Sequence, residues 1–284
     1  MACGAVSSCS IDAFMQSETF QNLLTHGAAV NLSNRSKWKL TGADRVRYLN
    51  GQVTNDVRRA NGRHTIYACV TDAKGRIAGD VMIHSRDEAL WLDAEEGLRE
   101  ALGMRLEKYI VADDVELTDV TDDWQLWHVF GPQAGEGLQG MRFGLPGMDV
   151  WLPVGESFVP CVPVLSLEEV ETLRVIQKVP RWPNELNSDT FPPEAGLEAR
   201  AMDFAKGCYI GQEILSRIKT TGKMPRQLVA GETDLELTRG SALHDASGRE
   251  IGLVTSTARH PMNGRFVVVG MVKSGSGDVA EFTS

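Results

Sequence analysis

Hydrophobic residues recur along the first 225 residues of the chain with two different spacings. Where they return every three or four positions, the pattern predicts amphipathic helices, and these segments are residues 11–24, 44–50, 96–110 and 166–177. Where apolar and polar residues alternate, the pattern predicts strands, and these runs are residues 28–32, 37–40, 65–70, 76–84, 89–92, 115–120 and 125–130. Helices and strands mix without a regular β-α-β order, so the expected fold class is α+β.

A hairpin is expected where the turn sequence Asp72-Ala-Lys-Gly75 separates two of these strands. The second strand has an apolar face and a polar face, formed by Ile77, Val81 and Ile83 on one side and by Asp80 and His84 on the other. This strand therefore carries a carboxylate in a position to face away from the core.

From residue 166 onward the sequence pattern differs from that of the first part of the chain. Ser166-Leu-Glu-Glu169 is a capping box that opens the helix ending near residue 177. Residues 180–196 hold four prolines and are expected to form an extended loop. From residue 227 onward only short strand-like runs remain, which predicts a small all-β domain over residues 226–284. Residues 1–225 then form the larger part.

Composition narrows the choice of function. The 284 residues include 29 basic and 38 acidic side chains, a formal charge of −9. General affinity for nucleic acid depends on neutralising phosphates with Lys and Arg, so direct nucleic-acid binding is not expected. The chain has no apolar stretch near the ~20 residues that span a bilayer. It has no signal-peptide pattern, and Ala2 excludes N-myristoylation, so a cytoplasmic protein without a membrane segment is expected.

The cysteine pattern excludes a self-contained metal site. The number is odd and no pair has C-x-x-C spacing, which predicts neither a disulfide framework, nor a zinc ribbon, nor an iron–sulfur site within one chain. The five cysteines are Cys3, Cys9, Cys69, Cys161 and Cys208.

The densest candidate for chemistry is Lys206-Gly-Cys-Tyr-Ile-Gly-Gln-Glu213, before a helix-like run at 213–218. A helix N-terminus and Lys206 would both lower the pKa of the Cys208 thiol, which describes a reactive cysteine. The other interpretation is a tight turn with an inert, buried cysteine. Residues 206–226 also carry five cations against one acid, a local charge of +4 that leaves −13 for the rest of the chain. This segment either attracts a polyanionic ligand or forms a solvated helix face.

The segment closely resembles the signature of the YgfZ family, the folate-binding relatives of the glycine-cleavage T-protein (aminomethyltransferase). The signature positions are Lys206, Gly207, Cys208, Tyr209, Gly211, Gln212 and Glu213. Further motifs resemble the family in the same order: Leu40-Thr-Gly-Ala-Asp44, Tyr48-Leu-Asn-Gly-Gln52, Thr54-Asn-Asp56, Lys74-Gly-Arg-Ile77, and residues 173–175 and 191–196. The resemblance covers about residues 28–272.

The resemblance implies two interwoven α+β subdomains, with residues 41–112 approximately the inserted one, and a C-terminal β-barrel. These parts are expected around a central cavity that holds tetrahydrofolate or a derivative. Arg174 aligns with an arginine near the folate and is the first folate-binding candidate; the other interpretation is a surface helix residue. Asn55 and Asp56 could also face the cavity, or serve as capping and turn residues.

One departure bears on catalysis. The T-protein has an adjacent Asp-Asp pair in the strand matching residues 76–84, whereas this chain reads Ala78-Gly79-Asp80. The leading hypothesis is therefore not a conventional enzyme but an accessory protein that binds folate and supports iron–sulfur cluster assembly or repair, and through it tRNA modification. Cys208 would be a transient cluster ligand or sulfur acceptor, with the other ligands supplied by assembly or client proteins.

Two other functions remain open. The first is a tetrahydrofolate-dependent aminomethyltransferase or methyltransferase, in which Asp80 would act on the folate nitrogen. The second is a cysteine hydrolase with Cys208 as nucleophile, although no hydrolase motif surrounds this residue.

Overall fold

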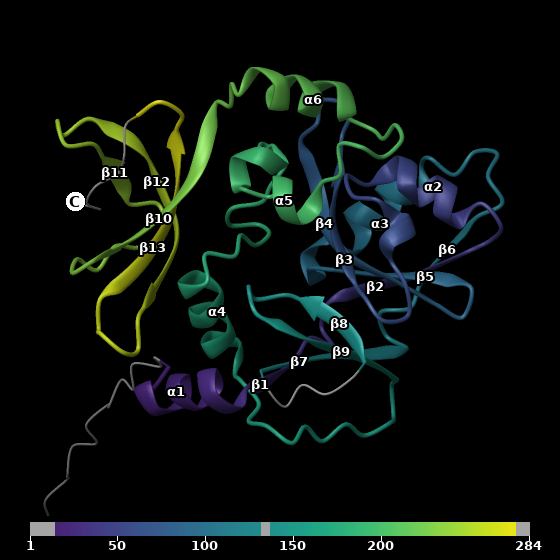
Figure 1. Cartoon of the computed structure of the whole chain (residues 1–284), viewed down its shortest axis with the longest axis horizontal. Helices are drawn as coiled ribbons and strands as arrows, with labels where there is room; N and C mark the ends of the chain where they lie inside the picture. Colours follow the sequence, from purple (N-terminus) through teal and green to yellow (C-terminus); the bar gives the residue numbers. More distant parts are fainter. Residues whose placement is uncertain (1–14, 132–136, 277–284) are drawn as a thin grey trace, which may run out of the picture.

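A computed structural model describes residues 15–131 and 137–276. Cys3, Cys9 and the start of the helix expected at residues 11–24 lie outside these ranges. Within them the chain forms three antiparallel sheets (Figure 1). The first sheet has the strand order β1-β7-β9-β8, the second β3-β4-β5-β2-β6, and the C-terminal sheet β10-β13-β12-β11.

The helices and strands have the following bounds. The α-helices are α1 (Ser17–His26), α2 (Arg45–Gln52), α3 (Arg99–Glu107), α4 (Leu167–Ile176), α5 (Glu198–Ala201) and α6 (Gln212–Thr221). The strands of the first two sheets are β1 (Ala28–Asn31), β2 (Ser36–Thr41), β3 (Ile66–Thr71), β4 (Ile77–Arg86), β5 (Ala89–Ala94), β6 (Glu116–Asp119), β7 (Trp124–Phe130), β8 (Leu138–Met141) and β9 (Pro146–Pro153). The C-terminal strands are β10 (Arg226–Thr233), β11 (Ala242–His244), β12 (Glu250–Arg259) and β13 (Phe266–Lys273).

The first two sheets are interwoven along the chain. The chain enters the first sheet with β1, builds the whole second sheet with β2–β6, and then returns to the first sheet with β7–β9. Apolar side chains from α2 and α3 pack on the second sheet, among them Leu49 and Leu102 against Trp38. Those of α1 and α4 pack on the first sheet, where Phe20 and Leu173 join Phe130.

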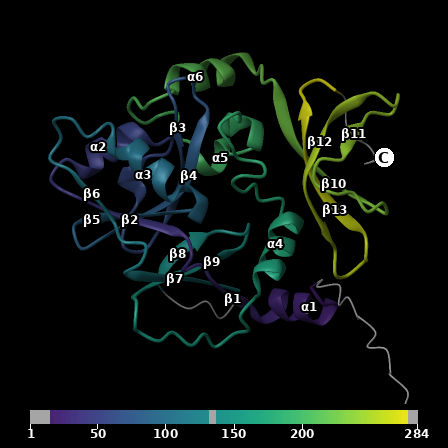
Figure 2. The ribbon, with the colours of Figure 1, turned by 180° about the vertical axis from the view of Figure 1, so that it is seen from behind.

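Helix α4 lies between the first sheet and the C-terminal sheet in both views (Figures 1 and 2). Val175 on this helix packs against Val267 and Val269 of β13. The expected capping box is present, because Ser166 Oγ accepts from the Glu169 amide at 3.2 Å while the Glu169 carboxylate accepts from the Ser166 amide at 2.8 Å. The α+β class and the interwoven arrangement are confirmed.

The hydrophobic pattern of the sequence was misleading in two strands, β4 and β9. The hairpin β3–β4 forms, but a register shift between Val70 and Thr71 places one extra residue in β4. Ile77 therefore packs with Cys69, on the opposite face from Val81 and Ile83. Strand β9 was not predicted, because its sequence from Pro146 to Pro153 contains glycine, aspartate and two prolines rather than a clear alternation.

Candidate functional site

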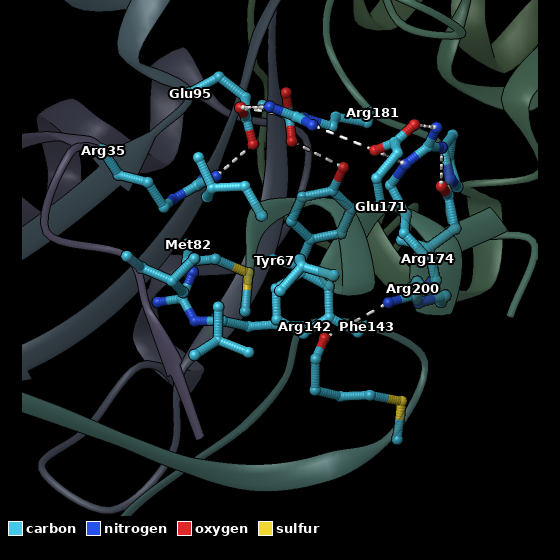
Figure 3. A pocket seen from close by; sticks show the side chains of 18 of the residues that line it. Arg35, Tyr67, Met82, Glu95, Arg142, Phe143, Glu171, Arg174, Arg181 and Arg200 are labelled. Carbon is cyan, nitrogen blue, oxygen red and sulfur yellow. Dashed lines mark hydrogen bonds and ion pairs between the residues drawn. The ribbon is translucent and has the colours of Figure 1, made fainter. Parts of the chain in front are cut away.

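A cavity of about 280 Å³ lies where the first sheet, the second sheet, α4 and α5 meet (Figure 3). Strands β3 and β4 contribute Tyr67, Asp80 and Met82 to its lining, and the connection from β8 to β9 contributes Arg142 and Phe143. The opposite wall comes from α4, α5 and the chain around residue 180. Concave sites with mostly apolar walls and a few polar groups are typical of small-molecule binding.

Charged side chains form a row of ion pairs along one wall of the cavity (Figure 3). Glu95 accepts from Arg35 and from Arg181, the latter with a nitrogen–oxygen distance of 3.2 Å. Arg181 also pairs with Glu171 at 3.1 Å, and Glu171 pairs with Arg174. This row of ion pairs connects the second sheet to α4 along the rim of the cavity.

Arg174 lines the cavity, but all the hydrogen-bond donors of its guanidinium are used by groups of the protein itself. The side chain is 3% exposed. Its five N–H groups donate to both oxygens of Glu171, to the Val179 carbonyl at 2.7 Å, to Glu185 at 3.0 Å and to the Ser256 hydroxyl at 2.7 Å. Ser256 belongs to β12, so Arg174 joins α4 to the C-terminal sheet. Arg174 is thus a buried connecting residue with no remaining donor, rather than a surface helix residue.

Asp80 projects from β4 into the same cavity. Tyr67 donates a hydrogen bond to its Oδ2 at 3.0 Å, whereas among the described residues Oδ1 is buried and has no hydrogen-bond partner. Burial raises the pKa of Asp80 to about 6, and the positive charge of Arg35 and the Tyr67 hydrogen bond oppose this rise in part. A buried carboxylate oxygen without a partner is costly unless a ligand satisfies it.

Arg200 is the cavity arginine with the weakest attachment to the protein. Its guanidinium donates one long bond, 3.4 Å, to the Met141 carbonyl and lies 5.9 Å from the centre of the Tyr67 ring. Sequence reasoning missed Arg200, Tyr67, Arg142 and Phe143. The predicted hairpin was the available signal for Tyr67. Cys69, two residues further along the same strand, pairs with Asp80, so Tyr67 shares the face of that carboxylate.

The signature segment packs against the other sequence motifs instead of lining the cavity. Lys206 turns inward and donates to the carbonyls of Asn50, Val53 and Asn55 at 2.6, 2.7 and 2.9 Å. Gly211 has φ +88° and lies against the β3–β4 turn, where a Cβ atom would be 2.6 Å from the Asp72 carbonyl oxygen. Only glycine meets both requirements.

Cys208 lies on the surface, four residues before the first residue of α6. The ammonium of Lys206, which the sequence offered as an activator of this thiol, is bound to the carbonyls of Asn50, Val53 and Asn55. The excess positive charge of residues 206–226 is also smaller than the sequence suggests, because the Arg226 guanidinium pairs with the Glu194 carboxylate at 3.2 Å. The cations left facing solvent along α6 and just after it are Arg217, Lys219 and Lys223.

Asn55 and Asp56 lie outside the described cavity lining. The Asn55 amide donates to the Tyr67 carbonyl at 2.9 Å, directly behind the cavity. Asp56 accepts from the Arg58 amide and pairs with the Arg58 guanidinium at 2.7 Å. Asp56 therefore has the capping role that was its other interpretation.

The residues that the structure describes offer neither a metal-binding cluster nor a membrane-spanning helix. No group of three or more His, Cys, Asp and Glu side chains is arranged to hold a metal ion in that part of the chain. None of its helices is both long and apolar enough to cross a bilayer.

Comparison with known proteins identifies the family. The GCVT N-terminal domain matches residues 12–144. The tRNA-modifying protein YgfZ of Klebsiella pneumoniae is 30% identical over 244 residues, which cover 71% of this chain and 73% of that protein. The chain belongs to the YgfZ family.

Two further proteins are also similar to this chain. The mitochondrial iron-sulfur cluster assembly factor IBA57 homolog of Phaeosphaeria nodorum is 28% identical over 222 residues, 70% of this chain, which spans about half (53%) of that relative. The crystal structure of glycine cleavage system aminomethyltransferase T from Bartonella henselae superposes with a TM-score of 0.77 at 20% identity, covering 89% of this chain and 80% of the other. The latter likeness confirms the fold expected from the sequence.

Proposed function

We propose that this YgfZ-family protein binds a reduced folate in the cavity beside Asp80 and supports iron–sulfur cluster assembly or repair, and through it tRNA modification. The observation that carries the folate proposal is the buried Asp80 carboxylate, one oxygen of which lacks a partner among the described residues. The names of the relatives, a tRNA-modifying protein and an iron–sulfur cluster assembly factor, support the second part.

The residues of the cavity fit the chemistry of a folate. A pterin ring carries N–H donors and two flat faces, and its glutamate tail carries carboxylates. Asp80 Oδ1 can accept from the pterin, Tyr67 and Phe143 offer aromatic surfaces, and Arg200 can pair with a carboxylate. The volume of about 280 Å³ is near the lower end of the ~300–1,000 Å³ range of ligand pockets, which suits the ring with the tail at the rim.

Cys208 is the proposed contact with the iron–sulfur cargo. Its thiol is exposed and stands apart from the cavity lining. Because the described residues hold no complete set of cluster ligands, the other ligands would come from an assembly protein, a client enzyme or a second copy. Loss of function in Cys208→Ser, measured by complementation of a deletion strain, tests this role; full complementation removes it.

The folate proposal is tested by titrating the purified protein with reduced folates. Arg200→Ala is expected to weaken binding about tenfold or more, because a charge-assisted hydrogen bond contributes roughly 1.5–3 kcal/mol. Arg217→Ala on α6, at an exposed position outside the cavity lining, is the matched control and should bind as the wild type does. Absence of binding to the wild-type protein refutes the proposal.

Aminomethyl or methyl transfer is the second candidate, and Asp80 is the observation that favours it. A carboxylate with its pKa raised to about 6 is suited to exchange a proton near neutral pH. Ala78-Gly79 precede it where the T-protein has a further acid, so one carboxylate would have to act alone. Formation of methylenetetrahydrofolate from an aminomethyl donor decides between the two functions.

A further inference from the structure

Lys206 occupies a buried position that the proposed function does not explain. Its ammonium donates to three carbonyls, which satisfies all three of its N–H groups. Asn50 lies in the last turn of α2, and Val53 is the residue that ends this helix. The last carbonyls of a helix lack intrahelical donors and carry the negative end of the helix dipole, so a cation there is favourable.

The third carbonyl connects Lys206 to the cavity. It belongs to Asn55, whose side-chain amide donates to the backbone carbonyls of Tyr67 at 2.9 Å and of Arg200 at 3.5 Å. The side chains of Tyr67 and Arg200 both line the cavity. Asn55 is thus a clamp between two cavity residues that come from different elements, β3 and α5.

The neighbouring Thr54 strengthens the same connection. Its hydroxyl donates to the Ala201 carbonyl at 2.6 Å and accepts from the Cys69 amide at 2.9 Å. The Thr54 carbonyl accepts from the Asp203 amide at 3.0 Å. Residues 54 and 55 therefore tie strand β3 to the chain that leads from α5 into the signature.

We propose that Lys206 is a positioning residue that couples the cavity to the exposed Cys208 loop, so that ligand binding and the accessibility of the thiol depend on each other. Cys208 is two residues from Lys206 in the chain, and the ammonium of Lys206 fixes the backbone of this loop to Asn55. A ligand that orders Tyr67 and Arg200 also orders Asn55, and through it the loop. Such a coupling is reciprocal in its binding free energies.

This inference rests on the proposed folate site, and the variants are chosen to separate the two. Lys206→Met keeps the side-chain volume but leaves three carbonyls without their donor. Asn55→Ala cuts the connection on the cavity side and keeps Lys206. Lys223→Met removes one positive charge at an exposed position after α6 and is the matched control.

The first readout is affinity for 5-formyltetrahydrofolate, measured by calorimetry. Lys206→Met and Asn55→Ala are expected to bind about tenfold more weakly, a change of 1.4 kcal/mol, although neither residue lines the cavity. Lys223→Met should bind as tightly as the wild type. Wild-type affinity in both cavity-linked variants overturns the proposal, and Asn55→Ala decides alone if Lys206→Met does not fold.

The second readout is the rate at which N-ethylmaleimide modifies Cys208, followed by peptide mass mapping. Without folate, Lys206→Met and Asn55→Ala should react several-fold faster than the wild type. Saturating folate should slow the wild-type reaction several-fold and leave both variants unaffected. A wild-type rate that does not respond to bound folate overturns the coupling. A wild-type protein that binds no folate refutes the proposed function instead, while the folate-free rates still test the connection.

Discussion

Asp80→Asn should stabilise the protein and impair its ligand site at the same time. In the folded protein Asp80 is 8% exposed as a residue, and burial raises the pKa of its carboxyl to about 6, compared with an ordinary 3.8. At pH 7 the side chain is ionised in the folded and unfolded states, so the folded state bears the cost of a buried charge.

The magnitude follows from the two pKa values. Each pKa unit corresponds to 1.36 kcal/mol, so the difference of about two units equals about 3 kcal/mol at pH 7. The sign follows from proton binding. Between pH 4 and 6 the folded state binds more protons at Asp80 than the unfolded state, so this residue makes stability fall as the pH rises. Well below pH 3.8, the ordinary pKa of the group, the carboxyl is neutral in both states and the cost disappears.

Urea denaturation of the wild type and Asp80→Asn at several pH values measures this effect. Subtracting the two curves removes the contribution of other carboxylates, such as Asp93, whose pKa is lowered on folding. The variant should gain about 2–3 kcal/mol at pH 7 and only about 0.5 kcal/mol at pH 4, while its folate affinity falls about tenfold or more. A stability difference that stays constant over this range would refute the argument that burial raises the pKa of the Asp80 carboxyl in the folded protein.

Four other substitutions separate structural from functional residues. Arg174→Ala should lose about 3–5 kcal/mol in denaturant unfolding, because it leaves a carboxylate buried without its partner; Arg200→Ala should change stability by under about 0.5 kcal/mol, since its guanidinium makes one long bond. Equal stability losses in the two would contradict these assignments. Gly211→Ala should cost at least about 2 kcal/mol, seen as a lower melting temperature, because a left-handed backbone and a 2.6 Å contact both oppose a Cβ atom. Cys208→Ser should melt like the wild type, since the thiol is exposed, and a marked destabilisation would show that Cys208 has a structural role.

The parts that could be predicted from the sequence are those that depend on near neighbours or on the family signature. The capping box from Ser166 to Glu169 is four residues long, and its two hydrogen bonds are present. Asp80 was correctly expected on the polar face of a hairpin strand, and it faces the cavity. The resemblance supplied the fold that no periodicity could give.

The roles of Arg174 and Lys206 could not be predicted in this way, because their partners are distant in the chain. Arg174 reaches Ser256, 82 residues away, and Lys206 reaches Asn50, 156 residues away. From the sequence, Arg174 was a folate-binding candidate or a surface helix residue, and Lys206 was a cation that would lower the pKa of the Cys208 thiol. Burial against carboxylates and carbonyls gives both residues a structural role that the sequence did not indicate.

The return of the chain to the first sheet limits how the protein can be divided. The match to the GCVT N-terminal domain ends at residue 144, but β9 begins at Pro146 and lies between β7 and β8. A fragment cut at residue 144 would separate β8 from the strand it pairs with and leave one side of β7 open. Unpaired strand edges recruit other chains, so such a fragment should aggregate when expressed. A shortened protein meant to keep the first sheet has to extend at least through residue 153.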